Sequence, residues 1–250
     1  FELDHPGAER IRVEHKLWCD DDQIDEREKA VRMSMLLKGA LVSGAAGTGK
    51  TRGVLEKLRD RLIAQGETVH VCAYTHAAAR LVGGITIARL LKFDARLHDA
   101  WILVDEWSLI PIDTLGQLAR MQLVNAKFVL FGDHEGQFGP MKDRWDVPYS
   151  KVPSSALLKT MCRGLSITLT EYVRGTDMQL FGHYTSLYNK CDLDLRDLVK
   201  HARAAYPVRV HSPFEFDIVL CVSHANRMLC NARMNQSKSV RSRCCGQAAI

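Results

Sequence analysis

The chain has 250 residues, of which 46% are hydrophobic and 25% charged, and these proportions are ordinary for a globular protein with a buried core. No stretch approaches the roughly 18 apolar residues that a membrane helix needs, and the first residues lack the order of a secretory signal, so we expect no membrane association and no secretion. The formal net charge of +5 permits a polyanionic partner without requiring one. The eight cysteines form no Cys-x-x-Cys pair, which argues against a zinc ribbon and favours a reducing intracellular compartment.

Short apolar runs alternate with helical patterns along the first half of the chain. Strands are predicted at 40–43, 68–74, 101–104 and 127–131, and helices at 25–37, 50–64, 75–82 and 112–124. This alternation predicts an α/β fold, in which a parallel sheet carries helices on both faces.

The stretch from Asp143 to Pro153 contains two prolines and few apolar residues, and we predict that it connects two domains. The predicted organisation is a helical lead-in at 1–38, a nucleotide-binding domain at 39–150, and the start of a second domain at 151–250. Beyond the connection, strands are predicted at 165–170 and 216–222, and helices at 177–188, 193–205 and 224–235.

A glycine-rich loop lies between the first predicted strand and the following helix. It fills every specified position of the pattern G-x-x-x-x-G-K-[ST], with Gly44, Ala45, Ala46, Gly47, Thr48, Gly49, Lys50 and Thr51. Glycines let backbone N–H groups turn toward phosphate oxygens, and the helix N-terminus adds partial positive charge. We expect Lys50 to contact the outer phosphates and the Thr51 hydroxyl to ligate Mg²⁺. The loop therefore predicts binding and hydrolysis of ATP or another nucleoside triphosphate.

Two acidic residues, Asp105 and Glu106, follow the apolar strand at 101–104. Because ligands bind at the carboxyl ends of parallel strands, we expect this pair beside the glycine loop. Asp105 is predicted to hold Mg²⁺ together with Thr51, since hard cations prefer oxygen ligands. Glu106 is predicted to polarise the attacking water as a general base.

The segment 131–140, Phe-Gly-Asp-His-Glu-Gly-Gln-Phe-Gly-Pro, ends the fourth predicted strand. With the glycine loop and Val-Asp-Glu-Trp-Ser at 104–108, it resembles motifs I, II and III of superfamily 1 helicases. Leu-Thr-Glu-Tyr-Val-Arg at 169–174 is similar to motif IV. Order and spacing match over residues 40–190, and the chain most resembles the RecD/Pif-type branch, which includes relatives in large DNA viruses.

The resemblance implies a fold and a function. The fold is that of a P-loop NTPase with a RecA-like sheet, followed by a partial second RecA-like domain that is incomplete at the C-terminus. The function is that of an ATP-dependent DNA helicase, a motor that hydrolyses the nucleotide with Mg²⁺ and translocates on single-stranded nucleic acid. Gln137 would sense the γ-phosphate, and Arg174 would reach the phosphates from the second domain as a cationic finger.

Nucleic-acid contacts are implied in two further segments. Tyr-Thr-His-Ala at 74–77 is similar to motif Ia, so Thr75 and His76 would contact the strand. Thr86 lies in a segment that resembles the next conserved element of the family, and would hold a phosphate without reading sequence. Thr75 is equally suited to cap the helix that begins there. Arg174 also has an ordinary interpretation as a surface arginine, and Trp101 and Trp107 are expected in the core.

The chain departs from the family at two places. The family has a Gln for the adenine in a Gln-x-x-Ala-Val context, whereas the matching run here is Arg27–Val31 with Glu28 at the nearest register, which leaves base preference open. Motifs V and VI, with their second arginine finger, are not found before Ile250.

Two alternatives to a DNA helicase remain open. A viral-type RNA helicase shares motifs I to III, and strand displacement on matched DNA and RNA would separate the two. A regulatory P-loop NTPase without unwinding activity would hydrolyse nucleotide at a rate that single strands do not change. The sequence gives no indication of protein partners.

Overall fold

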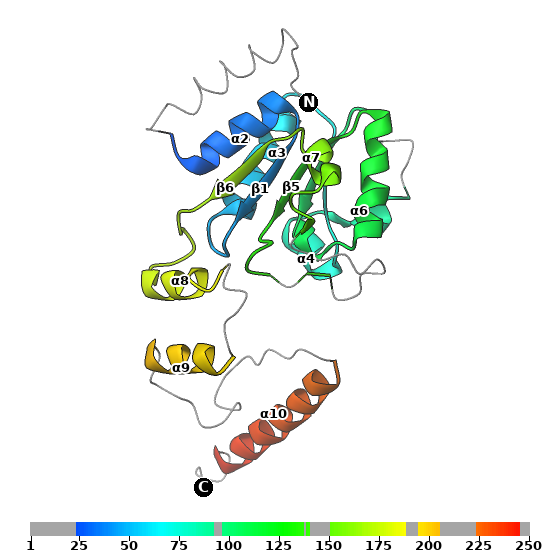
Figure 1. The fold of residues 1–250 in the computed structure, drawn as a ribbon. Coiled ribbons are helices and arrows are strands. Elements are labelled where there is room, and N and C mark those ends of the chain that lie inside the picture. Colours follow the sequence, from blue (N-terminus) through cyan, green and yellow to red (C-terminus); the bar gives the residue numbers. More distant parts are fainter. Residues whose placement is uncertain are drawn as a thin grey trace. The chain divides into compact units, whose positions relative to one another are not determined.

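The computed structural model describes residues 24–92, 97–137, 139–140, 151–188, 195–205 and 224–245. It contains two compact units, Phe1–Lys190 and Cys191–Ile250. The first unit is built on one parallel sheet with the strand order β3-β2-β4-β5-β1-β6 (Figure 1). Its strands are β1 (Ala40–Gly44), β2 (Val69–Ala73), β3 (Ile85–Thr86), β4 (Trp101–Asp105), β5 (Lys127–Gly132) and β6 (Ser166–Leu169).

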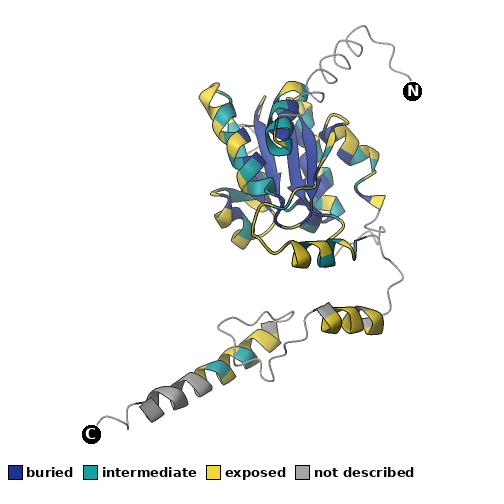
Figure 2. Ribbon diagram, turned by 90° about the vertical axis from the view of Figure 1, so that its left-hand side faces the viewer, coloured by how far each residue is buried: buried dark blue, intermediate teal, exposed yellow. Residues whose placement is uncertain are grey.

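The central strands are buried on both faces, as their unbroken apolar runs require. Successive side chains point to opposite faces, so each strand contributes to two cores. In β4, Trp101 and Leu103 join one core, whereas Ile102 and Val104 join the other. Figure 2 shows the result: the strands are buried, and exposed residues lie on the surrounding helices and loops.

Two sets of helices cover the two faces of the sheet. The core around Val42 and Phe131 is closed by α2 (Glu26–Leu37), the π-helical segment η1 (Lys50–Leu55) and α3 (Glu56–Ala64). The opposite core, around Leu41 and Leu130, is closed by α5 (Ile87–Leu90), α6 (Ile112–Ala119), the 3-10 turn η4 (Arg120–Val124) and α7 (Ala156–Met161). Two shorter elements, α4 (His76–Leu81) and η3 (Trp107–Leu109), follow the carboxyl ends of β2 and β4. The predicted α/β fold with helices on both faces is confirmed.

The predicted elements differ from the observed ones in detail. The helix expected at 50–64 opens with six residues of wider π-helical turns before α3 begins. The short strand β3 with α5, and the helix α7, were not among the expected elements; β3 has only two residues, too few to show an alternating pattern.

The strand β6 corrects the predicted domain boundary. It pairs in parallel with β1, in the register Leu41 to Ser166 and Gly44 to Leu169. Val152 and Leu158 are also buried in the first core. The described residues from 151 to 188 therefore belong to the first unit, and the predicted boundary at residue 150 lies too early. The first unit continues through a strand at the edge of the sheet, and the local composition gives no sign of this.

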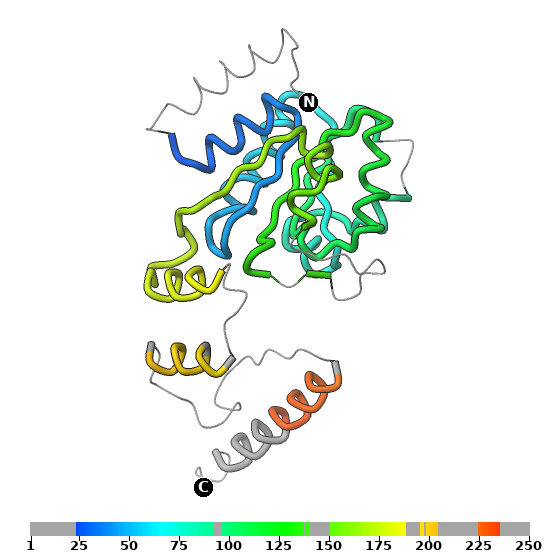
Figure 3. The backbone as a smooth tube through the Cα atoms, viewed as in Figure 1, coloured from blue at the N-terminus to red at the C-terminus, as the bar shows by residue number. Residues whose placement is uncertain are grey.

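After β6 the chain runs along the carboxyl edge of the sheet into α8 (Met178–Thr185), as the tube in Figure 3 shows. The second unit contains α9 (Leu195–Ala205), close to the predicted helix, and α10 (His224–Cys245), which begins at the predicted residue and extends past the predicted end at 235. The strand predicted at 216–222 lies outside the described residues. Among the helices that the structure describes, none has the length and apolarity to cross a membrane.

Candidate functional site

The glycine loop leaves the buried strand β1 and turns sharply before η1. Gly47 and Gly49 have φ values of +91° and +87°, in the left-handed region that disfavours other residues. Gly47 also admits a close neighbour, because a Cβ there would lie 2.4 Å from Cε2 of Tyr172. The sequence pattern thus meets two backbone requirements of this loop.

Lys50, at the start of η1, reaches back over the loop. Its Nζ donates to the carbonyl oxygens of Gly44 at 2.5 Å and Ala45 at 2.9 Å. Burial lowers the pKa of Lys50, whereas the carboxylates of Asp133 and Glu106 act in the opposite direction. The ammonium group therefore lies where phosphate oxygens would replace backbone carbonyls as acceptors.

Thr51 and Asp105 meet at the edge of the sheet, as predicted. The Thr51 hydroxyl donates to Oδ2 of Asp105 at 3.3 Å, and the backbone N–H of Glu106 donates to Oδ1 at 3.1 Å. Burial, together with the neighbouring charge of Glu106, raises the pKa of Asp105 to about 6. A hydroxyl and a buried carboxylate are hard oxygen donors, and the repulsion between the two acids would be relieved by a cation. The residues present therefore fit Mg²⁺.

Glu106 has an unusual backbone and an unsatisfied side chain. Its φ of 53° lies in the left-handed region, which is costly for a residue with a side chain and is found at functional sites. Its Oε2 is buried and has no hydrogen-bond partner. A buried carboxylate oxygen without a donor is suited to accept a hydrogen bond from a reacting water.

Gln137 is held in place by a residue that sequence reasoning did not single out. The Ser108 hydroxyl donates to Oε1 of Gln137 at 2.6 Å, and Ser108 is completely buried. Ser108 follows Glu106 by two residues, so this bond connects the segment after β4 with the segment after β5. A hydrogen bond therefore joins the segment that carries Asp105 and Glu106 to Gln137, the predicted γ-phosphate sensor.

Asp133, at the end of β5, was also missed as a site residue. Its carboxylate accepts from the N–H of Gly136 at 2.8 Å and from the Tyr188 hydroxyl at 2.7 Å. Burial and this bond to Asp133 raise the pKa of Tyr188. The signal that could have identified Asp133 is its place in the Gly-Asp-x-x-x-Gln pattern.

Arg174 lies near the loop, but it comes from the first unit. The N–H groups of Val173 and Arg174 donate to the Gly47 carbonyl at 2.9 Å and 3.1 Å. Besides burial, the positive charge of Arg174 contributes to the lowered pKa of Lys50, so the two cations are close. The expectation that Arg174 reaches the loop from a second domain is wrong, because β6 beside β1 delivers it from the same sheet.

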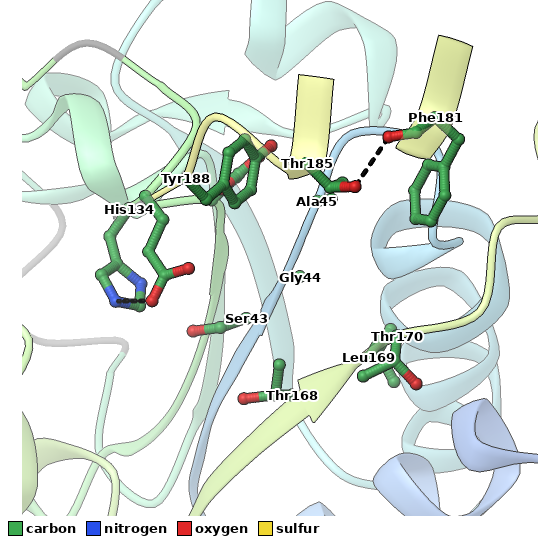
Figure 4. A pocket seen from close by; sticks show the side chains of 12 residues that line it. Ser43, Gly44, Ala45, His134, Thr168, Leu169, Thr170, Phe181, Thr185 and Tyr188 are labelled. Atoms are coloured by element: carbon green, nitrogen blue, oxygen red, sulfur yellow. Dashed lines mark hydrogen bonds and ion pairs between the residues drawn. The ribbon is translucent and has the colours of Figure 1, made fainter. Parts of the chain in front are cut away.

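The segment after β6 covers the loop with aromatic rings. Phe181 of α8 stacks on Tyr172 with ring centroids 4.6 Å apart, and Tyr184 meets Phe181 edge-on at 5.5 Å. The Tyr184 hydroxyl donates to the Ala46 carbonyl. Beneath this cover lies a cavity of about 280 Å³, in which Phe181 and Tyr188 lie across from Ser43 and Thr168 (Figure 4).

The predicted nucleic-acid contacts lie at the ends of β2 and β3, which β4 and β5 separate from β1 and the glycine loop. The hydroxyls of Thr75 and Thr86 accept from the N–H groups of Ala78 and Arg89 and thus cap α4 and α5. His76 is exposed at the start of α4. Trp101 and Trp107 are buried in the cores, as expected.

Glu28 does not face the glycine loop. Its carboxylate accepts two hydrogen bonds from Arg61 at 2.9 Å and 2.7 Å and one from Arg32 at 2.7 Å. The bond from Arg61, followed by that from Arg32, lowers the pKa of Glu28 to about 2. It is Arg27 that lies against the loop, since Cβ atoms at Gly49 and Gly53 would lie 3.0 Å and 2.7 Å from Arg27 Cδ. The expected register at Glu28 is therefore wrong by one residue, since the Gln-x-x-Ala-Val pattern counted back from Ala30 and Val31 falls on Arg27.

Three features lie on one parallel sheet: a phosphate loop after β1, a Thr–Asp oxygen pair between η1 and β4, and a glutamine after β5. Together they define a P-loop nucleoside-triphosphate-binding protein. Residues 21–142 match a protein-family model described as an AAA domain. A search among curated proteins finds no match.

Solved structures of Pif1 helicases share the fold. The Pif1 helicase from Candida albicans superposes with a TM-score of 0.65 at 20% identity, over 84% of this chain and 53% of that one. Bacteroides sp Pif1 in complex with ADP-AlF4 gives 0.58 at 19% identity, over 85% and 56%. Bacteroides Pif1 bound to ssDNA gives 0.57 at 18% identity, over 85% and 56%. The chain thus spans about half the length of these helicases. The predicted RecA-like P-loop fold and the resemblance to Pif-type helicases are confirmed.

Proposed function

We propose that this chain is the motor part of an ATP-dependent superfamily 1 helicase, which translocates on single-stranded nucleic acid, with DNA favoured over RNA. The observation that carries the proposal is that Lys50 and the backbone of Arg174 bond to the glycine loop and Asp105 bonds to Thr51, while Gln137 bonds to Ser108 beside the acidic pair. A generic nucleotide-binding fold needs only the loop and the metal pair. The glutamine and the arginine are what a motor needs to sense the γ-phosphate and respond to its loss.

The residues divide the work of hydrolysis. Lys50 and the loop N–H groups bind the phosphates, and Thr51 and Asp105 would hold Mg²⁺, which neutralises charge on the phosphate oxygens. Glu106 accepts a proton from the attacking water. Arg174 stabilises the charge that develops on the transferred group, and Gln137 detects that group through its amide. The base of the nucleotide is not specified by these contacts.

We further propose that Thr75, His76 and Thr86 contact the nucleic-acid strand. Thr75 and His76 are exposed at the start of α4, and Thr86 is at the start of α5. Hydroxyl groups bind phosphates without reading the bases, as a motor that moves along any sequence requires. The relative solved as "Bacteroides Pif1 bound to ssDNA" supports this proposal. Because its proposed substrates are ATP and nucleic acid, we propose that such a motor works inside the cell or at a viral replication site.

The second unit is proposed to begin the second RecA-like domain, with residues 1–38 as a lead-in to the first. In a two-domain motor, closure on ATP and opening after hydrolysis produce a step along the strand. A viral-type RNA helicase and a regulatory NTPase are the competing functions. Neither is favoured by a specific contact in the described residues.

The rate of ATP hydrolysis with and without added strands tests the proposal. We expect oligo(dT) to raise kcat by about tenfold or more, and a Thr75→Ala, Thr86→Ala double variant to lose most of that increase while keeping the basal rate. Stimulation by single-stranded RNA alone would favour the RNA helicase. Hydrolysis that neither strand changes would favour the regulatory NTPase and reject the motor.

A further inference from the structure

The first turn of α2 is bound to the segment that carries Arg174. The Glu26 carboxylate accepts from the N–H of Thr170 at 3.0 Å, from the Thr170 hydroxyl at 3.1 Å and from the N–H of Glu171 at 2.9 Å. Glu26 and Thr170 are 144 residues apart. These bonds exceed what is needed to start a helix, because the helix already has Asp25 as its N-cap.

The hydrogen bonds to Glu26 take the place of the strand-to-strand hydrogen bonds, which end with β6. Pairing of β6 with β1 ends at Leu169, so the residues that follow have no neighbouring strand. Thr170 and Glu171 are exposed, so their N–H groups would otherwise take water as the acceptor. Glu26 supplies one for Thr170 and Glu171, and it thereby sets the direction in which the chain leaves the sheet.

Arg27 extends the same contact to the glycine loop. Its Nη2 donates to Oε2 of Glu171 at 2.7 Å, and its Nε donates to Oδ2 of Asp25 at 3.0 Å. The Arg27 side chain is only 12% exposed, and its Cδ lies against Gly49 and Gly53 at the start of η1. One side chain therefore touches the end of the phosphate loop and the segment after β6.

The other end of that segment is fixed by the loop itself. The N–H groups of Val173 and Arg174 donate to the Gly47 carbonyl, and the Val173 side chain packs against Gly49. Residues 170–174 are thus tied to α2 at one end and to the loop at the other. A shift at Thr170 would be passed to Arg174 over only four residues.

We propose that Glu26 and Arg27 are positioning residues, which set Arg174 beside the phosphate loop for hydrolysis. The inference rests on the proposed function, in which Arg174 stabilises the transferred phosphoryl group. Stabilisation of this kind depends on donors that are already in place, and a misplacement of about 1 Å can cost about a hundredfold in rate. Both residues act on Arg174 through residues 170–174.

The test compares kcat of ATP hydrolysis in four proteins: wild type, Glu26→Ala, Arg174→Ala and the double variant. We expect Glu26→Ala to lower kcat by about tenfold to a hundredfold, with the nucleotide Kd changed by less than about threefold. In the Arg174→Ala background, the same substitution should change kcat by less than about twofold, because the residue it positions is gone. Glu26→Gln, which keeps one acceptor oxygen, should restore part of the rate.

Glu28→Ala is the matched control, since it removes a carboxylate from the same helix but breaks bonds to Arg61 and Arg32. It should lower Tm without lowering kcat. An equal loss of kcat from Glu26→Ala in both backgrounds would overturn the proposal.

Amide hydrogen exchange tests the positioning independently of hydrolysis. In Glu26→Ala, the amides of Val173 and Arg174, which do not bond to Glu26, should exchange about tenfold faster than in wild type. Unchanged exchange there, in Glu26→Ala and in Glu26→Gln alike, would overturn the proposal. Hydrolysis that survives Lys50→Ala would instead reject the proposed function, and the exchange result would still decide the role of Glu26.

Discussion

The Thr51 hydroxyl donates a hydrogen bond to the Asp105 carboxylate across 3.3 Å, although 54 residues separate them in the chain. The bond joins the first residue after Lys50 to the last residue of β4. It places a hydroxyl and a carboxylate together, with the carboxylate of Glu106 beside them. Two neighbouring carboxylates repel each other unless a cation lies beside them, so this arrangement costs stability and serves a function.

Asp105→Asn should stabilise the protein in the absence of Mg²⁺ and abolish ATP hydrolysis in its presence. Burial, with the charge of Glu106, raises the pKa of Asp105 from its ordinary value of 3.8 to about 6, so ionisation disfavours folding increasingly between these two pH values and by the full amount above about pH 6. We expect the variant to gain about 1 to 3 kcal/mol in free energy of unfolding at pH 8. The gain should shrink as the pH falls below 6, where wild-type Asp105 becomes protonated. Urea unfolding at pH 8 and pH 5 measures it, and a variant less stable at both pH values would contradict the assignment.

Ser108→Ala should slow hydrolysis by releasing Gln137. The Ser108 hydroxyl is the donor that holds Oε1 of Gln137 at 2.6 Å. We expect kcat to fall by about tenfold, with a loss of about 1 kcal/mol in stability from the unpaired amide oxygen. Ser34→Ala is the control, since it also removes a buried hydroxyl, which bonds within α2 to Ala30. Equal kcat values for the two variants would show that Ser108 is only structural.

Gly47→Ala should damage the loop through a contact as well as through backbone strain. The new Cβ would lie 2.4 Å from Cε2 of Tyr172, and φ is +91°. Gly66→Ala is the control for strain alone, because φ is +78° there and no atom lies within 4 Å. Each should lose about 1 kcal/mol from strain, with a further 1 to 3 kcal/mol at Gly47, measured as the free energy of unfolding. Equal losses would mean that Tyr172 does not pack on the loop.

The sequence could predict those parts of the site that local patterns encode. The glycine loop requires left-handed backbone at Gly47 and Gly49, so its residue types identify it. The acidic pair follows an apolar strand, and the topology of a parallel sheet places it beside the loop. Both features depend on residues that are adjacent in the chain.

The parts that were missed depend on contacts between distant residues. Nothing in the local sequence indicates that Tyr188 bonds to Asp133 or that Glu26 bonds to Thr170, since these pairs are 55 and 144 residues apart. Arg27 is an exception, because the Gln-x-x-Ala-Val pattern counted back from Ala30 and Val31 falls on Arg27, and the sequence could have indicated it in place of Glu28. The place of β6 at the sheet edge beside β1 could not be read from its four residues.

The measurement that tests the account most directly is the rate of ATP hydrolysis, in the presence of Mg²⁺, by the wild-type chain and by Lys50→Ala. Lys50 is bonded to two carbonyl oxygens of the loop and does not belong to either core. We expect wild type to hydrolyse ATP, and the variant to lose at least about a hundredfold in kcat while its circular dichroism and Tm stay close to wild type. Normal turnover by a folded Lys50→Ala variant would contradict the assignment of the glycine loop as the site of hydrolysis.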